Sequence, residues 1–313
     1  MTDNDPRWER ELVAKLAGAG LIEQRRARRW GIFFKLLGFA YLTVVLLLLL
    51  DWKQGPSTSG KHTALVDISG IIAPGADANA ERVNAALQAA FKDSNTQGVV
   101  LRVNSPGGSP VQAQTIYAEI RRLRKLHPEI PLYAVIEDIC ASGGYYVAVS
   151  ADKIYVSPSS IIGSIGVRMD SFGVTGLMEK LGVERRLLTA GENKGMLDPF
   201  LPENPNDKAH MQTLLREVHQ QFIGAVQEGR GKRLKDNPDI FTGLIWTGQT
   251  GIQMGLADAL GGVDYVAREV IKAEDIVDYT QKESITEKFA RRVGASAAHS
   301  LGAMVLGRSY ALR

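Results

Sequence analysis

A serine set among very small residues is the first candidate for chemistry in this sequence. Ser142 lies in the stretch ICASGGYYVA, with Ala141 before it and Gly143 and Gly144 after it. Small neighbours let a backbone approach another molecule closely, although each glycine loses much conformational freedom on folding. A serine in such a position could act as a nucleophile, and a nucleophilic serine needs a base to take its proton.

Two glycine-rich turns follow strand-like runs of apolar residues. NSPGGS, residues 104–109, follows the run 99–103, and ASGGY, residues 141–145, follows the run 132–136. Ligands bind at the carboxyl ends of strands in α/β sheets, and a helix follows each turn with an N-terminus that favours negative charge. The pattern favours an oxyanion hole made of two backbone N–H groups, one from each turn. From these residues alone, two ordinary tight turns remain an alternative.

The base is harder to find, because no histidine lies in either turn. The sequence positions of the five histidines predict that they are surface residues. They lie near a linker, at a helix end, in a polar helical stretch and near the C-terminus: His62, His127, His210, His219 and His299. A lysine can replace histidine when burial keeps its amine neutral. Lys194 lies in TAGENKGMLDPF beside apolar residues that could exclude water. Most loop lysines are solvated, so this signal is weak by itself.

Other sequence patterns that are typical of catalytic sites are weak or missing. SADK, residues 150–153, matches the S-x-x-K of penicillin-recognising enzymes, but the S-D-N and K-T-G elements are missing. No G-x-S-x-G elbow surrounds Ser142, because residue 140 is cysteine. Cys140 is the only cysteine, which excludes an intrachain disulfide, and its apolar and small neighbours favour an inert thiol. The sequence contains no P-loop and no metal-ligand spacing.

The strongest apolar run predicts a transmembrane helix over residues 30–52, WGIFFKLLGFAYLTVVLLLLLDW. A span needs about 20 mostly apolar residues, and this one holds a single lysine, Lys35, near enough to its end to reach the interface. Trp30 and Trp52 bracket the run as interfacial residues do. A cleaved signal peptide fits less well, because a long charged segment precedes the run and no small-x-small site directly follows it.

The flanking charges predict the orientation of this span. Four arginines lie in RRARRW, residues 25–30, whereas only Lys53 and Lys61 follow the span within a similar distance. Because positive residues stay inside, residues 1–29 are predicted to form a cytoplasmic tail. Residues 53–62 are a linker, and the rest of the chain is predicted outside the plasma (inner) membrane, in the periplasm.

From residue 63 onward, strand-like and helix-like runs alternate. In NAERVNAALQAAFKD the apolar residues recur at helical spacing: Val83, Leu87, Ala90 and Phe91. Such alternation predicts an α/β fold with a largely parallel sheet, in one domain over residues 63–271. The weak net charge of +3 argues against nucleic-acid binding, which would need basic residues clustered on one face, whereas the basic residues cluster near the N-terminus. Residues 272–313 form a C-terminal extension that could pack on the core, on a neighbouring subunit or on the membrane surface.

Five stretches in register resemble the signal peptide peptidase A (SppA) family of membrane-anchored serine proteases. They are NSPGG, ASGGYYVA, GSIGV at 163–167, NKGMLDPF at 193–200 and WTGQTGIQMGLADALGG at 246–262. The resemblance covers roughly residues 65–270. It implies the short, single-domain form of the family and the fold of the Clp protease and the crotonases.

The resemblance also implies roles for single residues. By position, Ser142 would be the nucleophile and Lys194 the general base of a Ser/Lys dyad. The oxyanion donors would be the amides of Gly108 and Gly143. An extended peptide would add along a substrate-binding strand. That strand comprises Ser164, Ile165, Gly166 and Val167. Asp198 lies in the lysine loop, and a pair with Lys194 would raise the lysine pKa and hinder the base.

The implied partners follow from the same resemblance. Serine and lysine would meet across subunit contacts of a homo-oligomer anchored in the lipid bilayer by its N-terminal helix. The substrates would be remnant signal peptides and other hydrophobic peptides at the membrane, and no cofactor, metal or nucleotide is implied. Two alternatives remain. A crotonase-like acyl-CoA enzyme is disfavoured because coenzyme A is cytosolic, and a non-catalytic membrane scaffold would retain the fold without the reaction.

Overall fold

The computed structural model describes residues 6–49 and 60–281 of the 313-residue chain. The described residues divide into two units, residues 6–49 and residues 60–281. Trp52, most of the predicted linker and the greater part of the predicted C-terminal extension lie outside the described residues.

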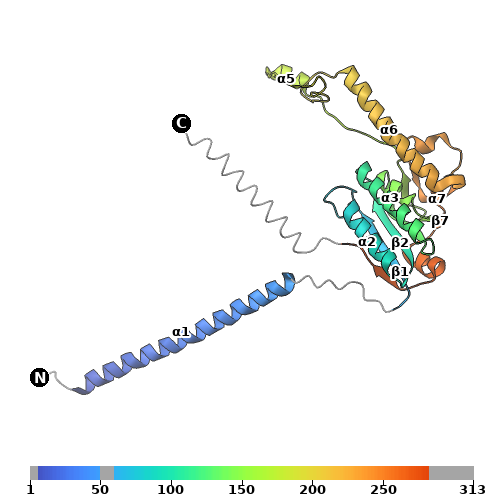
Figure 1. Cartoon of the computed structure of the whole chain (residues 1–313). Helices are drawn as coiled ribbons and strands as arrows, with labels where there is room; N and C mark the ends of the chain where they lie inside the picture. Colours follow the sequence, from blue (N-terminus) through green and yellow to red (C-terminus); the bar gives the residue numbers. More distant parts are fainter. Residues whose placement is uncertain (1–5, 50–59, 282–313) are drawn as a thin grey trace. The chain divides into compact units, whose positions relative to one another are not determined.

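The described part of the first unit is one long helix, α1, which runs over Pro6–Leu49 (Figure 1). The predicted tail and most of the predicted span therefore form one continuous helix. Val13–Leu46 has a hydropathy of 1.5 and is long and apolar enough to cross a membrane, by length and composition. Its described apolar side chains, such as Phe39, are exposed, which suits a hydrocarbon surrounding better than water. The apolar N-terminal helix that the sequence predicted is therefore present.

The second unit is built on an eight-stranded sheet with the main order β6-β5-β3-β2-β1-β8. In addition, β4 pairs with β3, and β7 pairs with β4. Among the described strands, every pairing is parallel except that between β5 and β6. The strands are β1 His62–Ser69, β2 Thr96–Ser105, β3 Leu132–Ala141, β4 Lys153–Val156, β5 Ile161–Gly163, β6 Ile245–Thr247, β7 Ala259–Leu260 and β8 Ile276–Asp278. The predicted α/β fold with a largely parallel sheet is confirmed.

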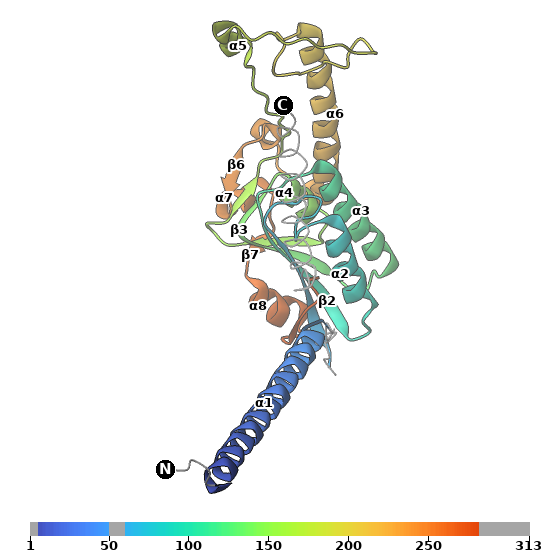
Figure 2. The same ribbon diagram turned by 90° about the vertical axis from the view of Figure 1, so that its left-hand side faces the viewer.

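Helices cover both faces of this sheet, so the strands are buried on both sides. The helices are α2 Ala80–Lys92, α3 Pro110–Leu126, α4 Gly143–Ala148, α5 Thr175–Leu181, α6 Pro205–Arg230, α7 Gly248–Met254 and α8 Val263–Tyr265. On one face, α2 and α3 bury their apolar sides against alternate strand residues such as Val66 and Leu101 (Figure 2). The predicted apolar face of α2 is buried as its helical spacing requires. On the other face, Leu65 and Val100 pack with Val266, just after α8.

The sheet also includes a strand from beyond the predicted domain end. β8 pairs in parallel with β1, and its central residue Val277 is buried. This strand lies past residue 271, in the segment that the sequence assigned to the C-terminal extension. A strand of three residues is too short to be recognised from its sequence pattern. It was missed because it forms only by pairing with the free edge of β1.

One part of the second unit has no core of its own. From residue 166 to residue 221, no residue is buried. We call residues 168–221 the arm; it contains α5, the following loop and the N-terminal part of α6. Figures 1 and 2 show α5 at the end of α6 that lies away from the sheet. α6 enters the core only from Phe222 onward.

Candidate active site

Ser142 occupies a sharp junction between β3 and α4. Its backbone has a φ of 52° and a ψ of −122°, a conformation that non-glycine residues rarely adopt. Its N–H donates to the Gly163 carbonyl at 2.9 Å, and its carbonyl accepts from the N–H of Tyr146 at 2.9 Å. The side chain does not cap α4. The backbone is thus held from both sides while the hydroxyl is left available, as at other sites where strain serves function.

The turn after β2 packs directly on this junction. Gly107 has a φ of 101°, and a Cβ there would lie 2.7 Å from the Gly143 nitrogen and 2.8 Å from the Ser142 Cβ. Gly108 has a φ of 150°, and a Cβ there would overlap the Ile72 carbonyl oxygen. Both positions therefore require glycine, because the two turns approach more closely than a side chain permits.

The same approach brings two backbone amides together beside Ser142. A Cβ built on Gly143 would lie 3.2 Å from the nitrogen of Gly108. Neither amide has a hydrogen-bond acceptor in the part of the chain that the structure describes. The two residues predicted as oxyanion donors are thus neighbours with unused N–H groups. Such a pair can stabilise negative charge on a carbonyl oxygen attacked by the serine.

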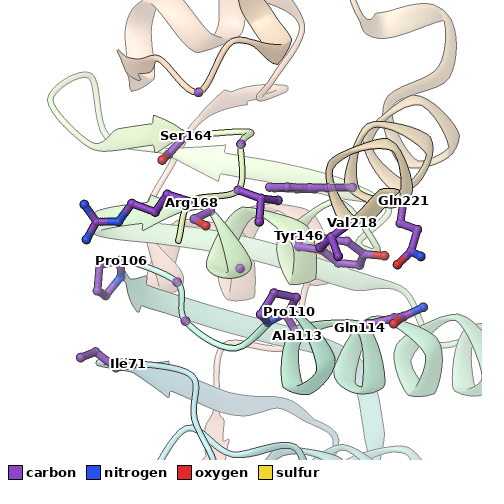
Figure 3. A pocket seen from close by; sticks show the side chains of 18 of the residues that line it. Ile71, Pro106, Pro110, Ala113, Gln114, Tyr146, Ser164, Arg168, Val218 and Gln221 are labelled. Carbon is purple, nitrogen blue, oxygen red and sulfur yellow. The ribbon is translucent and has the colours of Figure 1, made fainter. Parts of the chain in front are cut away.

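Ser142 opens into a cleft of about 760 Å³, shown in Figure 3. Its walls come from the turns after β1, β2 and β3, the starts of α3 and α4, the segment after β5, the middle of α6 and the residues before β6. The lining comprises Ile71, Pro106, Gly107, Gly108, Pro110, Ala113, Gln114, Ser142, Gly143, Tyr146, Ser164, Gly166, Val167, Arg168, Val218, Gln221, Phe222, Thr242 and Gly243. Arg168 is the single charged residue of this lining.

The predicted substrate-binding residues divide between the cleft and the core. β5 ends at Gly163, so residues 164–167 continue from the strand without belonging to it. Ser164, Gly166 and Val167 line the cleft, whereas the Ile165 side chain is fully buried among core residues. The Ser164 N–H donates to the Leu244 carbonyl at 2.8 Å.

Lys194 lies in the arm, in the loop between α5 and α6, and it is exposed. It does not line the cleft, and neither a lysine nor a histidine does so within the described residues. The structure of one chain therefore does not bring the predicted base to Ser142. Asp198 does not pair with Lys194; its carboxylate accepts from Arg185 at 3.1 Å. A hydrogen bond from the Phe200 N–H, together with Arg185, lowers the pKa of Asp198.

Two histidines are placed differently from the sequence prediction of surface residues. His62 is fully buried, and its Nε2 lies 2.9 Å from the Tyr279 hydroxyl. His219 is partly buried on α6, with Nε2 3.1 Å from the Ile165 carbonyl oxygen. Because a carbonyl only accepts, this nitrogen must carry a proton. His219 thus ties α6 to the segment that lines the cleft, a long-range contact that its polar helical surroundings in the sequence did not reveal.

Cys140 is not a second nucleophile at this site. Its side chain is fully buried, and burial raises the pKa of the thiol strongly. A buried thiol with a raised pKa is a poor nucleophile, in line with the expectation from its neighbours in the sequence. Among the described residues, no group of three or more histidine, cysteine, aspartate or glutamate side chains is placed to hold a metal ion.

Part of the sequence that forms this site is similar to a known protein family. Residues 124–277 match peptidase family S49. That range includes the Ser142 turn and the lysine loop but begins after the turn of Gly107 and Gly108. A putative protease of Synechocystis sp. is 31% identical over 210 residues, which cover 67% of this chain and 73% of the relative. A putative signal peptide peptidase SppA of Enterococcus faecium is 29% identical over 230 residues, covering 71% of this chain and 66% of the relative.

Other similarities cover less or are weaker. A Brucella melitensis protein named Na⁺/H⁺ antiporter NhaA is 49% identical over 175 residues, 56% of this chain. The chain spans only 24% of that protein's length. Among solved structures, a mutant of a membrane-bound stomatin-specific protease in complex with a substrate peptide has a TM-score of 0.40 and 13% identity. The match covers 75% of this chain and 99% of that one.

Proposed function

The chain belongs to peptidase family S49, and we propose that it is a membrane-anchored serine endopeptidase that uses Ser142 and Lys194. The observation that carries this proposal is the junction at Ser142. A serine with a φ of 52° stands beside the amides of Gly108 and Gly143, which have no acceptor in the described part of the chain. All three residues line one cleft. A non-catalytic scaffold has no need for this combination.

The proposed reaction follows from these groups. Ser142 Oγ attacks the peptide carbonyl while the Lys194 amine takes the hydroxyl proton. The amides of Gly108 and Gly143 hold the negative oxygen of the tetrahedral intermediate. The lysine then gives its proton to the leaving amine, and an acyl-enzyme remains. Water, deprotonated by the same lysine, hydrolyses the ester and frees Ser142.

In this proposal the lysine comes from a neighbouring copy of the chain in a homo-oligomer. Lys194 lies on the arm, away from the cleft of its own chain. The arm exposes large apolar side chains, among them Phe172 at 82% and Leu188 at 98%. Large apolar side chains exposed to water are typical of surfaces that bind another molecule. Docking against a second copy would cover this surface and would also remove water from around the Lys194 amine. Loss of hydration favours the neutral form of a lysine, which can then act as a base.

We further propose that α1 anchors the enzyme in the inner membrane, with residues 1–29 in the cytoplasm and the second unit in the periplasm. The exposed apolar surface of α1 and the arginines that precede its most apolar part support this orientation. The substrates would be remnant signal peptides and other hydrophobic segments released at the membrane. The cleft fits such chains, because its lining contains one charged residue and much apolar surface.

The experiment that tests the proposal is active-site labelling of the full chain in membranes with a fluorophosphonate, followed by mapping of the adduct. We expect modification at Ser142 and none in Ser142→Ala. Lys194→Ala should lose both labelling and cleavage of a hydrophobic peptide, while its assembly stays intact. Ser164→Ala tests the other serine of the cleft that has a positive φ, and labelling should persist in it because its hydroxyl is not the proposed nucleophile. An adduct on Ser164 or Ser109, or full activity in either dyad variant, would overturn the assignment.

A further inference from the structure

One end of the cleft is a pocket between three helices. We call it the helix pocket; it comprises Ala113, Gln114, Tyr146, Val218, Gln221 and Phe222. We propose that this pocket selects the side chain of the residue whose carbonyl is attacked, and that the Tyr146 hydroxyl favours an uncharged side chain with a hydrogen-bonding tip, glutamine above methionine. The inference rests on the proposed peptidase function and specifies its substrates.

The floor of the helix pocket is apolar and well packed. Ala113 and Phe222 are buried, and the rings of Tyr146 and Phe222 have centroids 4.9 Å apart. Val218 adds an aliphatic wall from α6. The methylene groups of a substrate side chain would therefore meet carbon on several sides, which favours a stem of two or three apolar carbons.

The helix pocket adjoins the two amides that would hold the attacked carbonyl. A Cβ built on Gly143 would lie 3.4 Å from the Ala113 Cβ. Tyr146 lies one helical turn after Ser142, and its N–H donates to the Ser142 carbonyl. A residue whose carbonyl oxygen reaches Gly143 thus has its own side chain beside Ala113 and Tyr146. The side chain lies this close because it is attached to the Cα, which is bonded directly to the attacked carbonyl carbon.

The Tyr146 hydroxyl distinguishes this pocket from a simple apolar one. The residue is 8% exposed and lines the cleft, and its hydroxyl has no hydrogen-bond partner among the described residues. The tyrosines around it are satisfied: Tyr117 donates to Glu228 at 2.9 Å, and Tyr145 to the Leu256 carbonyl at 2.7 Å. A hydroxyl left without a protein partner in such a place needs water or a ligand group.

Two further polar groups lie at the same end of the cleft. Figure 3 shows Gln114 and Gln221 on the same side as Tyr146 and Val218, whereas Arg168 lies with Pro106 and Ser164 on the other. An amide, like a hydroxyl, both donates and accepts hydrogen bonds. No charged side chain lines the helix pocket, but Glu228 lies behind it, where it adds to the rise that burial causes in the pKa of Tyr146. That carboxylate already accepts from Tyr117 and Arg121. A glutamate tip would lose hydration and be repelled by Glu228. An uncharged tip that both donates and accepts is the best match.

Glutamine and methionine separate these contributions, because their side chains have similar length and volume. Both would fill the apolar part of the helix pocket. Methionine would displace water from the Tyr146 hydroxyl and leave it unsatisfied, whereas the glutamine amide would replace that water. A site that hydrogen-bonds its substrate rejects an analogue lacking the partner more strongly than an apolar site rejects a change of size.

The test uses the full chain in detergent with blocked peptides that differ only in glutamine, methionine or glutamate before the scissile bond. Mass spectrometry of the products fixes the bond that is cleaved. We expect kcat/KM to be about tenfold higher for glutamine than for methionine, and lowest for glutamate. Tyr146→Phe should bring the glutamine-to-methionine ratio to about one or below. Tyr117→Phe is the matched control and should keep the wild-type ratio, because that hydroxyl bonds Glu228 and does not line the cleft.

The outcomes distinguish this inference from the proposed function. Cleavage with equal rates for glutamine and methionine, or a ratio that Tyr146→Phe leaves unchanged, overturns the inference and leaves the peptidase intact. Failure of the wild type to cleave any of the peptides, with no fluorophosphonate adduct on Ser142, overturns both. Folding of Tyr146→Phe is checked by thermal unfolding, whose midpoint should stay close to that of the wild type.

Discussion

The sheet with its covering helices and the arm each carry one half of the proposed dyad, and they are held in opposite ways. Ser142 follows a central strand, and both neighbouring turns are fixed by contacts within the same chain. Lys194 lies in a region where no residue from 166 to 221 is buried. The proposed nucleophile and the two amides beside it are thus positioned within one chain, whereas the arm has no core to fix the proposed lysine. The difference ties the proposed activity to assembly.

The C-terminal part of α6, which follows the arm, is packed into the core. Arg230 at the end of α6 is 1% exposed and donates to both carboxylate oxygens of Asp258, at 2.8 and 3.0 Å. Its Nε also donates to the Gly255 carbonyl. A Cβ on Gly229 would overlap the Val149 carbonyl oxygen, so α6 presses directly on the end of α4. The direction of the arm is therefore set by the same packing that holds Ser142.

The largest expected effect comes from mixing two inactive variants. Ser142→Ala and Lys194→Ala should each lose at least about 10³-fold in kcat/KM. If neighbouring chains exchange their arms in a head-to-tail arrangement, co-assembly of the two should restore about a quarter of wild-type activity. The measurement is peptide cleavage by co-expressed chains with different affinity tags. No recovery in a verified mixed assembly would mean that one chain must supply both residues.

The next effect compares glycines in the two regions. Gly108→Ala should lower acylation of Ser142 about 10²–10³-fold, because the new methyl group overlaps the Ile72 carbonyl and displaces an oxyanion donor. Gly176→Ala in α5 is the control, since a Cβ there meets nothing within 4 Å. That change should leave labelling unaltered and stabilise α5 slightly. Equal losses in both variants would show that the arm is as tightly packed as the turn.

How far the sequence anticipated this site depends on the range of the contacts involved. The turns at Gly108 and Ser142 were recognisable because strand, glycine and helix signals are local. The burial of Ile165, one residue from Ser164 on the cleft, was not, because the segment leaves the regular strand at Gly163 and loses its alternation. His219 carried no local signal, since its partner lies 54 residues away. The assignment of Lys194 rests on resemblance and stays a prediction, and no sequence pattern indicates where an arm without a core will lie.

A third effect concerns pH and compares two carboxylates. Burial opposes ionisation of Asp258, but Arg230, the Ile154 N–H and Arg233 outweigh it and lower its pKa. Its ionised form therefore stabilises the fold above the unfolded pKa of about 4, and this stabilisation is lost as pH falls through the lower folded value. Thermal unfolding between pH 6 and about 2.5 should show this loss, and Asp258→Asn should show a smaller slope.

The arm offers the matched carboxylate for that experiment. Asp198 also has a lowered pKa, but its partner Arg185 is partly exposed and no core depends on the pair. Asp198→Asn should therefore leave the pH dependence of unfolding unchanged. Asp258→Ala, by contrast, leaves the buried Arg230 charge without its partner and should cost about 3–5 kcal/mol. Similar slopes for the two asparagine variants would place the acid-sensitive contact elsewhere.

The smallest expected effect is that of a leucine-to-alanine change in the arm, compared with the same change in the sheet. Leu132→Ala removes a fully buried side chain from β3 and should cost about 2–5 kcal/mol at any chain concentration. Leu188→Ala removes a side chain that is 98% exposed, so in separate chains it should change stability by less than about 0.5 kcal/mol. If the arm docks on a second copy, the cost of Leu188→Ala must grow with concentration, because assembly stabilises only the bound form. A Leu188→Ala cost that stays near zero up to concentrations where wild-type chains sediment as an oligomer would remove this side chain from the interface.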